Sequence, residues 1–260
     1  MHNIAVAILA AVCGLIGGCK TDVPQTSTTK STNTYAVVVG METSRFAGNC
    51  PGAGYDADRM YKLLCQYTPN AVLLRDGNAT KAAVTAALTS AIAKAGNGLV
   101  VFFYSGHGGS EPFGDTSAEE TDGKDEFYCL YDTYMRDNDM WKMIRECRGR
   151  IMLINDCCHS STLYRHPNIS LSKAVRLSAM SRRDGNSFSM LCWSGCPDDT
   201  YSYGASTGGQ FTNALLRHFD SKKTYDYLWN EIKSDKTLRQ YEDPQRTVIG
   251  RGFDGKAIFQ

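Results

Sequence analysis

Two short segments of the sequence hold residues that can act together in nucleophilic catalysis. His107 lies in the segment SGHGG (105–109), and Cys158 lies in NDCCHS (155–160). A cysteine attacks as its thiolate, and an imidazole can accept the thiol proton and later return it to a leaving group. The glycines around His107 leave room for a substrate backbone to approach the ring. The two segments therefore predict a cysteine nucleophile with a histidine acid/base partner.

Each segment follows a run of residues typical of a strand that is buried on both faces. LVVFFY (99–104) precedes His107, and IMLI (151–154) precedes Cys158. Such strands belong to parallel sheets, and active groups gather at the carboxyl ends of strands in these sheets. The sequence therefore predicts that the sulfur and the imidazole lie at neighbouring strand ends and face one cleft.

Strands and helices alternate along the chain, which is typical of βαβ units around a mainly parallel sheet. Apolar runs predict further strands at residues 35–40, 71–74, 127–131, 188–193 and 247–249. Helical spacing of apolar residues predicts helices at residues 55–67, 80–95, 139–147, 211–219 and 225–238. Gly96 is the expected stop of the second helix. Residues 105–126 and 165–187 are polar segments between these elements.

The paired motifs resemble those of metacaspases, which are relatives of caspases. YSGHG (104–108) and DCCHS (156–160) look like the histidine and cysteine signatures of that family, and WSGCPDD (193–199) and GQFTNAL (209–215) resemble its small-subunit part. His107 and Cys158 are 51 positions apart, close to the separation of about 50 residues found in caspases. The resemblance covers roughly residues 35–250. It implies a caspase-like three-layer α/β sandwich with a mainly parallel sheet of about six strands and helices on both faces.

The resemblance also implies a reaction, namely hydrolysis of peptide bonds after Arg or Lys through a thioester intermediate. Cys158 matches the nucleophile and His107 the general acid/base. Backbone N–H groups of Gly108 and Cys158 are the expected oxyanion donors, because a tetrahedral intermediate needs preorganised dipoles at its oxygen. The implied substrates are proteins or peptides with a basic side chain at P1, the residue before the cleaved bond.

A basic P1 side chain needs carboxylates in the S1 pocket that receives it. By the same resemblance, Asp156 and Asp56 match the two acidic positions of this pocket, and Ser105 is expected to line it. From its sequence context alone, Asp56 could instead be a residue at the start of a helix.

A protease with this preference could also cut itself. The basic segment 165–187 is expected to separate a large-subunit-like part (35–164) from a small-subunit-like part (188–260). An exposed loop is what a protease reaches. The candidate positions for cleavage are Lys173, Arg176, Arg182 and Arg183.

The cysteine chemistry requires no cofactor, but calcium is an open question. Some members of the family are activated by Ca²⁺, which prefers carboxylate oxygens as ligands. Asp122 and Asp139 fall where such ligands would lie. At two further positions Asn138 and Arg165 stand where acids are expected, and an arginine beside a divalent cation is electrostatically unfavourable. The sequence therefore leaves calcium dependence undecided.

The N-terminus resembles a bacterial lipoprotein signal. Residues 4–18 are apolar but too few to span a bilayer comfortably, and LIGGC (15–19) resembles a lipobox with Cys19 as the lipidated residue. The sequence thus predicts a signal peptide at 1–18, lipidated Cys19 and a flexible Thr/Ser-rich tether at 19–34, and a peptidase domain at 35–260. The expected location is the bacterial cell envelope, with the protein anchored to the membrane by lipid on the periplasmic or outer-surface side. Plain secretion and an uncleaved anchor are the alternatives.

Composition limits the other classes of function. The 260 residues carry a net charge of +1 and no long run of like charges, so a nucleic-acid partner is not expected. Ten cysteines are many for this length, but the absence of a C-x-x-C motif argues against zinc-ribbon and thioredoxin folds. Pairing of the remaining cysteines is left open, since a nucleophilic cysteine must stay reduced.

Three other interpretations compete with the protease. GASTG (204–208) fits the G-x-S-x-G motif and would make Ser206 the nucleophile of a serine hydrolase, if a strand turned there into a helix. The chain could be a binding module on an inactive protease fold, with Cys158 a buried structural thiol. A metal site of His107, Cys158 and His159 lacks a fourth ligand with recognisable spacing. Cys157 is expected to be a core thiol and His159 a packing residue.

Overall fold

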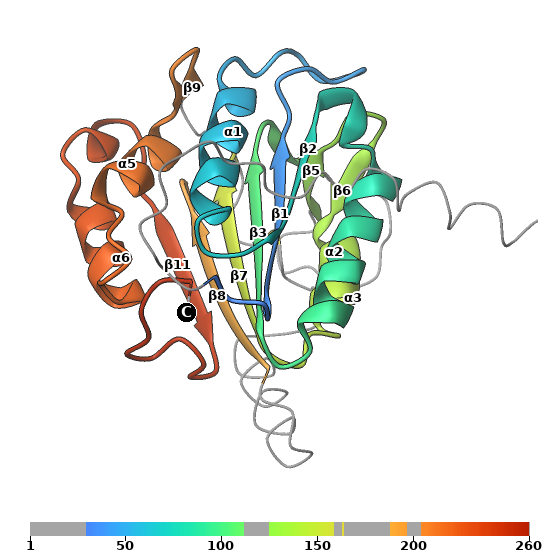
Figure 1. Ribbon diagram of the computed structural model, residues 1–260. Coiled ribbons are helices and arrows are strands. Elements are labelled where there is room, and N and C mark those ends of the chain that lie inside the picture. Colours follow the sequence, from blue (N-terminus) through green and yellow to red (C-terminus); the bar gives the residue numbers. More distant parts are fainter. Residues whose placement is uncertain (1–29, 112–124, 159–162, 164–187, 197–203, 260) are drawn as a thin grey trace, which may run out of the picture.

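A six-stranded sheet forms the centre of the protein in the computed structural model, which describes residues 30–111, 125–158, 163, 188–196 and 204–259 (Figure 1). The strand order is β11-β8-β7-β3-β1-β2, and β11 alone runs antiparallel to its neighbour. The strands are β1 (Thr34–Gly40), β2 (Asn70–Arg75), β3 (Leu99–Ser105), β7 (Arg150–Asp156), β8 (Ser189–Ser194) and β11 (Gln245–Ile249). The predicted sheet of about six mainly parallel strands is confirmed.

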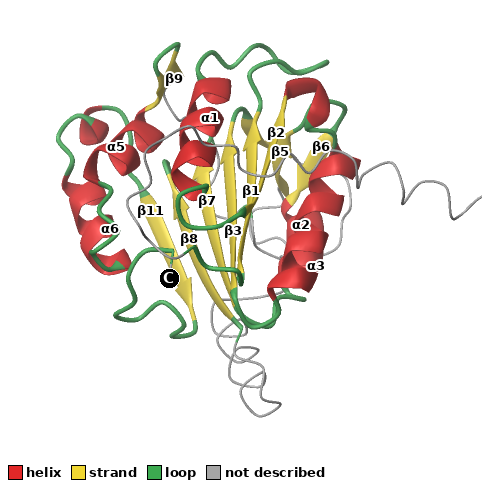
Figure 2. Ribbon diagram, viewed as in Figure 1, coloured by secondary structure: helices red, strands yellow, loops and turns green. Residues whose placement is uncertain are grey.

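Helices cover both faces of this sheet, as the fold class required (Figure 2). They are α1 (Ala53–Leu64), α2 (Lys81–Ala95), α3 (Asp137–Ile144), α5 (Gln210–His218) and α6 (Tyr225–Ser234). Successive residues of β1 point to opposite faces, so that Val37 and Val39 pack with α2 and α3 while Ala36 and Val38 pack with α1, α5 and α6. The two buried clusters enclose the sheet, and the three-layer sandwich is confirmed.

Local signals set the ends of α2. Thr80 caps its N-terminus by accepting a hydrogen bond from the backbone N–H of Ala83 at 3.2 Å. Gly96 follows the last residue with φ of +54°, a conformation that favours glycine. The predicted helix at 80–95 with its stop at Gly96 is therefore confirmed to within one residue.

The prediction was wrong where short polar strands occur. The polar segment 105–126 contains β4 (Gly108–Glu111) and the start of β5 (Asp125–Cys129), which pair with β6 (Tyr134–Arg136) in a small antiparallel sheet. A second pair, β9 (Gly204–Ala205) and β10 (Gly208–Gly209), forms a hairpin before α5. These strands have too few apolar residues to show the alternation that predicts a strand.

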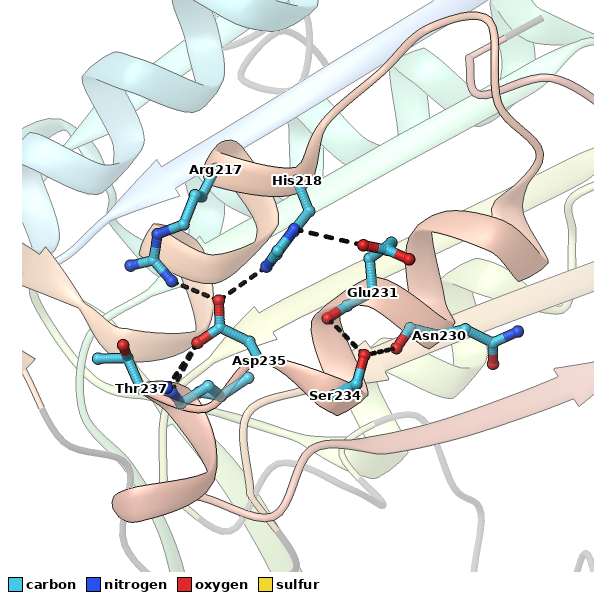
Figure 3. A network of polar contacts seen from close by, with 8 residues as sticks. Arg217, His218, Asn230, Glu231, Ser234, Asp235 and Thr237 are labelled. Carbon is cyan, nitrogen blue, oxygen red and sulfur yellow. Dashed lines mark hydrogen bonds and ion pairs between the residues drawn. The ribbon is translucent and has the colours of Figure 1, made fainter.

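Helix α6 ends four residues earlier than predicted, because Asp235 caps it and begins the 3₁₀ turn η3 (Leu238–Gln240). One carboxylate oxygen of Asp235 accepts hydrogen bonds from the backbone N–H groups of Thr237 and Leu238, both at 2.9 Å. The other accepts from Arg217 and from Nε2 of His218, at 2.7 Å for the histidine (Figure 3). The C-terminal end of α5 is thereby fixed to the end of α6.

Two further features concern the whole described part of the chain. None of its helices is long and apolar enough to cross a membrane. Seven of its cysteines are outside disulfide bonds: Cys50, Cys129, Cys147, Cys157, Cys158, Cys192 and Cys196.

Candidate active site

The carboxyl ends of β1, β3 and β7 lie side by side and in register. Gly40 pairs with Ser105, and Ser105 pairs with Asp156. The pairing of β3 and β7 extends one residue further, since the N–H of Gly106 donates to the carbonyl of Asp156 at 3.3 Å. His107 and Cys158 each follow this paired row by two residues. The sheet therefore brings the two segments singled out in the sequence to the same edge.

His107 and Cys158 line one cavity of about 410 Å³ at this edge. Asp56, Ser105 and Asp156, which the resemblance assigned to the S1 pocket, line the same cavity. The remaining lining residues are Asn49, Cys50, Pro51, Ala53, Gly106, Gly108 and Gly209. The expectation of one cleft shared by sulfur and imidazole agrees with this placement.

The imidazole of His107 is oriented by the loop between β1 and α1. Its Nε2 lies 3.2 Å from the backbone carbonyl of Asn49. A carbonyl oxygen only accepts hydrogen bonds, so Nε2 carries the proton and Nδ1 is the basic nitrogen of the neutral ring. The backbone of His107 is also held, because its carbonyl accepts from the N–H of Cys129 at 3.0 Å and from the buried hydroxyl of Tyr104 at 2.7 Å.

Gly108, whose N–H is an expected oxyanion donor, begins β4 beside the end of β7. His107 and Cys129 share a ladder hydrogen bond, so Gly108 and Tyr128 form the next, non-hydrogen-bonded pair of the antiparallel ladder. The N–H of Gly108 consequently points away from β5. A side chain on Gly108 would meet the carbonyl oxygen of Cys158 at 2.3 Å, which shows how closely the two strand ends approach.

Asp56 is fully buried and is held by hydrogen bonds from three elements. Its Oδ2 accepts from Ser105 Oγ at 3.0 Å and from the N–H of Gly209 at 2.8 Å, and its Oδ1 pairs with Nη2 of Arg59 at 2.6 Å. Burial, together with the nearby charge of Asp156, raises the pKa of Asp56 to about 7 despite these hydrogen bonds. Asp56 does lie in the first turn of α1. Its hydrogen bonds to Ser105 and Gly209 also connect it to β3 and β10, so its role is not limited to the start of the helix.

Asp156 lies at the N-terminal end of α5. Its Oδ2 accepts from the backbone N–H of Thr212 at 2.8 Å, and its exposed fraction is only 4%. Helix N-termini stabilise a negative charge in this way. Gly209 passes so close to Asp156 that a Cβ added to this glycine would lie 2.2 Å from Oδ2 of the carboxylate. A Cβ added to Gly208 would likewise lie 2.2 Å from Oδ1 of Asp56.

Several cavity residues had no signal in the sequence. Asn49 and Cys50 belong to the connection after β1, Ala53 is the first residue of α1, and Gly209 belongs to the β10–α5 junction. Loop residues follow no periodic pattern. The one available signal is that residues which follow a parallel strand lie at the carboxyl edge of the sheet, where active sites form. Burial raises the pKa of the Cys50 thiol to about 12.

The remaining predicted residues are Cys157, Ser206 and several positions that the structure does not describe. Cys157 is a buried core thiol, as predicted, and burial raises its pKa well above the usual range. Ser206 is exposed in the turn between β9 and β10, which is not the strand-to-helix turn that a nucleophilic serine of this motif needs. The positions outside the described residues are Cys19, Asp122, His159, Arg165, Lys173, Arg176, Arg182 and Arg183.

Asp139, the second predicted calcium ligand, is engaged otherwise. Its carboxylate forms an ion pair with Nζ of Lys81 at 2.6 Å. Among the residues that the structure describes, no three His, Cys, Asp or Glu side chains are grouped as metal ligands are.

The three-layer sandwich, with a cysteine and a histidine at adjacent strand ends, defines the caspase-like class of α/β proteins. Residues 33–242 match the caspase domain, and the chain belongs to that family of cysteine peptidases. No curated protein sequence gives a significant match.

Solved structures are similar over most of the chain. Protein GSU0716 from Geobacter sulfurreducens is 26% identical, with a TM-score of 0.68 over 87% of this chain and 98% of the other. Caspase-1 from Spodoptera frugiperda is 13% identical, with a TM-score of 0.55 over 88% of this chain and 94% of the other. The second likeness is one of fold.

Proposed function

We propose that the protein is a cysteine endopeptidase that cleaves after Arg or Lys, with Cys158 as nucleophile and His107 as general acid/base. The observation that carries the proposal is the shared cavity, in which both side chains occur together with Asp56 and Asp156. Membership of the caspase domain family supports peptide-bond hydrolysis. The two carboxylates support a basic P1 residue, because a buried cation needs an opposite charge beside it.

In the first half of the reaction, Nδ1 of His107 takes the proton of the Cys158 thiol, and the thiolate attacks the carbonyl carbon of the scissile bond. The electron pair of the carbonyl moves to its oxygen, which receives hydrogen bonds from the N–H groups of Gly108 and Cys158. The tetrahedral intermediate collapses as the C–N bond breaks, and the imidazolium gives its proton to the leaving amine. A thioester on Cys158 remains.

In the second half, His107 takes a proton from water, and the resulting hydroxide attacks the thioester carbonyl. The C–S bond then breaks, the proton returns to the Cys158 sulfur, and the carboxylate product leaves. The hydrogen bond to Asn49 keeps the ring aligned through both proton transfers, since it uses Nε2 and leaves Nδ1 for the chemistry. No metal or other cofactor takes part in these steps.

Three further features belong to the proposal. Self-cleavage occurs after one or more of Lys173, Arg176, Arg182 and Arg183. Cys19 carries the lipid that anchors the protein in the bacterial cell envelope, and a Cys19→Ser variant should lose its membrane association on fractionation. Calcium is not required, because Asp139 is paired with Lys81; addition of a chelator should leave the rate unchanged.

A panel of fluorogenic peptides tests the proposal. Peptides that differ only in Arg, Lys or Asp at P1 are compared on the wild type and on Cys158→Ala. We expect cleavage of the Arg and Lys peptides and loss of at least about 10³-fold in kcat/KM in the variant. Cleavage after Asp would contradict the assignment of Asp56 and Asp156. Failure of every peptide, with Cys158 unreactive, would favour a binding module on this fold.

A further inference from the structure

Arg59 is a residue whose position bears on the charge of the S1 pocket. It lies one turn after Asp56 on α1, and Nη2 of its guanidinium is 2.6 Å from Oδ1 of Asp56. It is not among the residues that line the cavity. Its positive charge therefore neutralises a pocket carboxylate from outside, without filling the space that a substrate side chain would take.

Arg59 is held in this position by two further contacts. The same Nη2 lies 2.7 Å from Oδ1 of Asn213 on α5, and the guanidinium carbon lies 4.4 Å from the ring centre of Tyr55. Gly208 closes over the pair, since a Cβ there would meet Asp56 at 2.2 Å and Arg59 at 2.5 Å. A guanidinium fixed by a carboxylate, an amide and an aromatic ring is preorganised for a charge-assisted hydrogen bond.

Several elements of the described structure place charged or polar groups around Asp56. Asp156 comes from β7, Arg59 from α1, and the Cys50 thiol from the loop before α1. Ser105 of β3, Gly209 of β10 and Asn213 of α5 contribute uncharged donors or acceptors. With both acids ionised, the positive charge of Arg59 offsets one of these two negative charges.

Resting on the proposed preference for basic P1 residues, we propose that Arg59 is a positioning residue for P1 specificity: it holds Asp56 as an anchored carboxylate at the S1 pocket. Asp56 already accepts three hydrogen bonds, whereas a carboxylate offers about four sites. Asp56 therefore shapes the pocket, and Arg59 sets the charge and the position of its carboxylate.

The experiment compares two peptides that differ only in arginine or citrulline at P1, because citrulline has the shape of arginine without its charge. The ratio of their kcat/KM values from pH 5.5 to 9.5 reports the charge that the pocket presents. For Arg59→Gln, above pH 8, we expect this ratio to rise about tenfold, since one positive charge beside the pocket is lost. The midpoint of its pH dependence should move upward by about one unit, because Asp56 loses a cationic partner.

Matched variants separate this role from a general effect on charge or folding. Arg75→Gln removes a charge that pairs with Asp58 and Glu42 rather than with Asp56, and it should behave as the wild type. Arg59→Lys keeps the charge and should restore most of the wild-type ratio. Asn213→Ala loosens Arg59 without a change of charge and should move the midpoint in the same direction by less, so the test survives if Arg59→Gln does not fold.

Each outcome is decisive. Wild-type ratio and midpoint in Arg59→Gln, or in Asn213→Ala if the first variant is unfolded, would overturn the role of Arg59. Equal effects in Arg75→Gln and Arg59→Gln, or no rescue by Arg59→Lys, would also overturn it. A wild-type protein that cleaves no basic peptide would instead contradict the proposed function, and the role of Arg59 in P1 specificity would fall with it.

Discussion

Asp56 and Asp156 are close to one another and almost without solvent exposure, and this placement affects how the protein responds to pH. The pKa of Asp56 is about 7 in the folded protein and has its ordinary value in the unfolded chain. The folded state therefore binds more protons between these values, so the contribution of Asp56 to stability is full below about pH 4 and is lost as pH rises through about 7.

Replacement of this residue tests the effect. In Asp56→Asn, the part of the pH dependence that Asp56 causes should vanish, so the wild-type free energy of unfolding should fall relative to that of the variant by the order of 2–4 kcal/mol between pH 4 and pH 8. Urea denaturation at several pH values measures this difference. A constant difference between the two proteins across this range would contradict the assigned pKa.

Gly209 offers a steric test of the same pocket. In Gly209→Ala the added methyl group would lie 2.2 Å from the Asp156 carboxylate, so the carboxylate or the start of α5 must move. We expect kcat/KM for the Arg peptide to fall at least about tenfold, with a loss of about 1–3 kcal/mol in stability. Gly255→Ala is a control for an added methyl group, although its φ of +63° adds strain of its own. An active Gly209→Ala protein would show that the pocket is looser than described.

Among single residues, those that lie at or just after the end of a buried strand can be predicted from the sequence. His107, Cys158 and Asp156 follow apolar runs that are easy to identify, and Asp56 came from the family resemblance. The pairing of Arg59 with Asp56 depends on side-chain packing between α1 and α5, which no local pattern reports. Residues brought in by long-range contacts were therefore missed.

Helix α5 is the element that connects the site to the rest of the fold. Its first turn donates to Asp156, and its last turn is bound through Arg217 and His218 to Asp235 (Figure 3). Burial raises the pKa of Asp235, but the hydrogen bonds from Leu238, His218 and Arg217 outweigh it and lower the pKa to about 2. Asp235 therefore stabilises the fold above about pH 4, and this stabilisation is lost as pH falls toward 2.

Asp235→Asn removes the charge that these groups share. We expect a loss of about 2 kcal/mol at pH 7, which shrinks at acid pH, and a higher KM for the Arg peptide because α5 is less firmly placed. Thermal or urea unfolding and steady-state kinetics measure the two effects. Glu231→Gln is the control, since Glu231 is half exposed and lies 3.8 Å from the His218 ring. Equal losses in both variants would contradict the central place of Asp235.

The main elements follow from sequence because the strands of the central sheet are continuous apolar runs and the helices have one apolar face. β4, β6 and the β9–β10 hairpin do not, since they are two to four residues long and glycine-rich or polar. Backbone pairing alone defines these strands, and such pairing leaves no periodic pattern in so short a segment. The small sheet and the hairpin that complete the site were accordingly missed.

For the molecule as a whole, β7 and β8 are adjacent parallel strands, and the candidate cleavage positions lie in the sequence between them. A cut there would leave the two pieces joined by the β7–β8 ladder and by both hydrophobic clusters. We expect the wild type to give two fragments on a denaturing gel while its native size is unchanged.

The same preparation of Cys158→Ala should remain one chain, and so should a variant with Lys173, Arg176, Arg182 and Arg183 all changed to alanine. The first variant removes the nucleophile and the second removes the basic residues that we propose as sites. Fragments of wild-type size from Cys158→Ala would show that another protease cuts the chain and would contradict self-processing.

The most direct test of the central claim is to locate a covalent adduct by peptide mass spectrometry. The protein is incubated with two peptidyl chloromethyl ketones that differ only in Arg or Asp at P1. We predict stoichiometric modification of Cys158 by the Arg reagent, with His107→Ala slowed by at least about 10²-fold, and little reaction with the Asp reagent. Modification of Cys50 in place of Cys158, or equal reaction with both reagents, would contradict it.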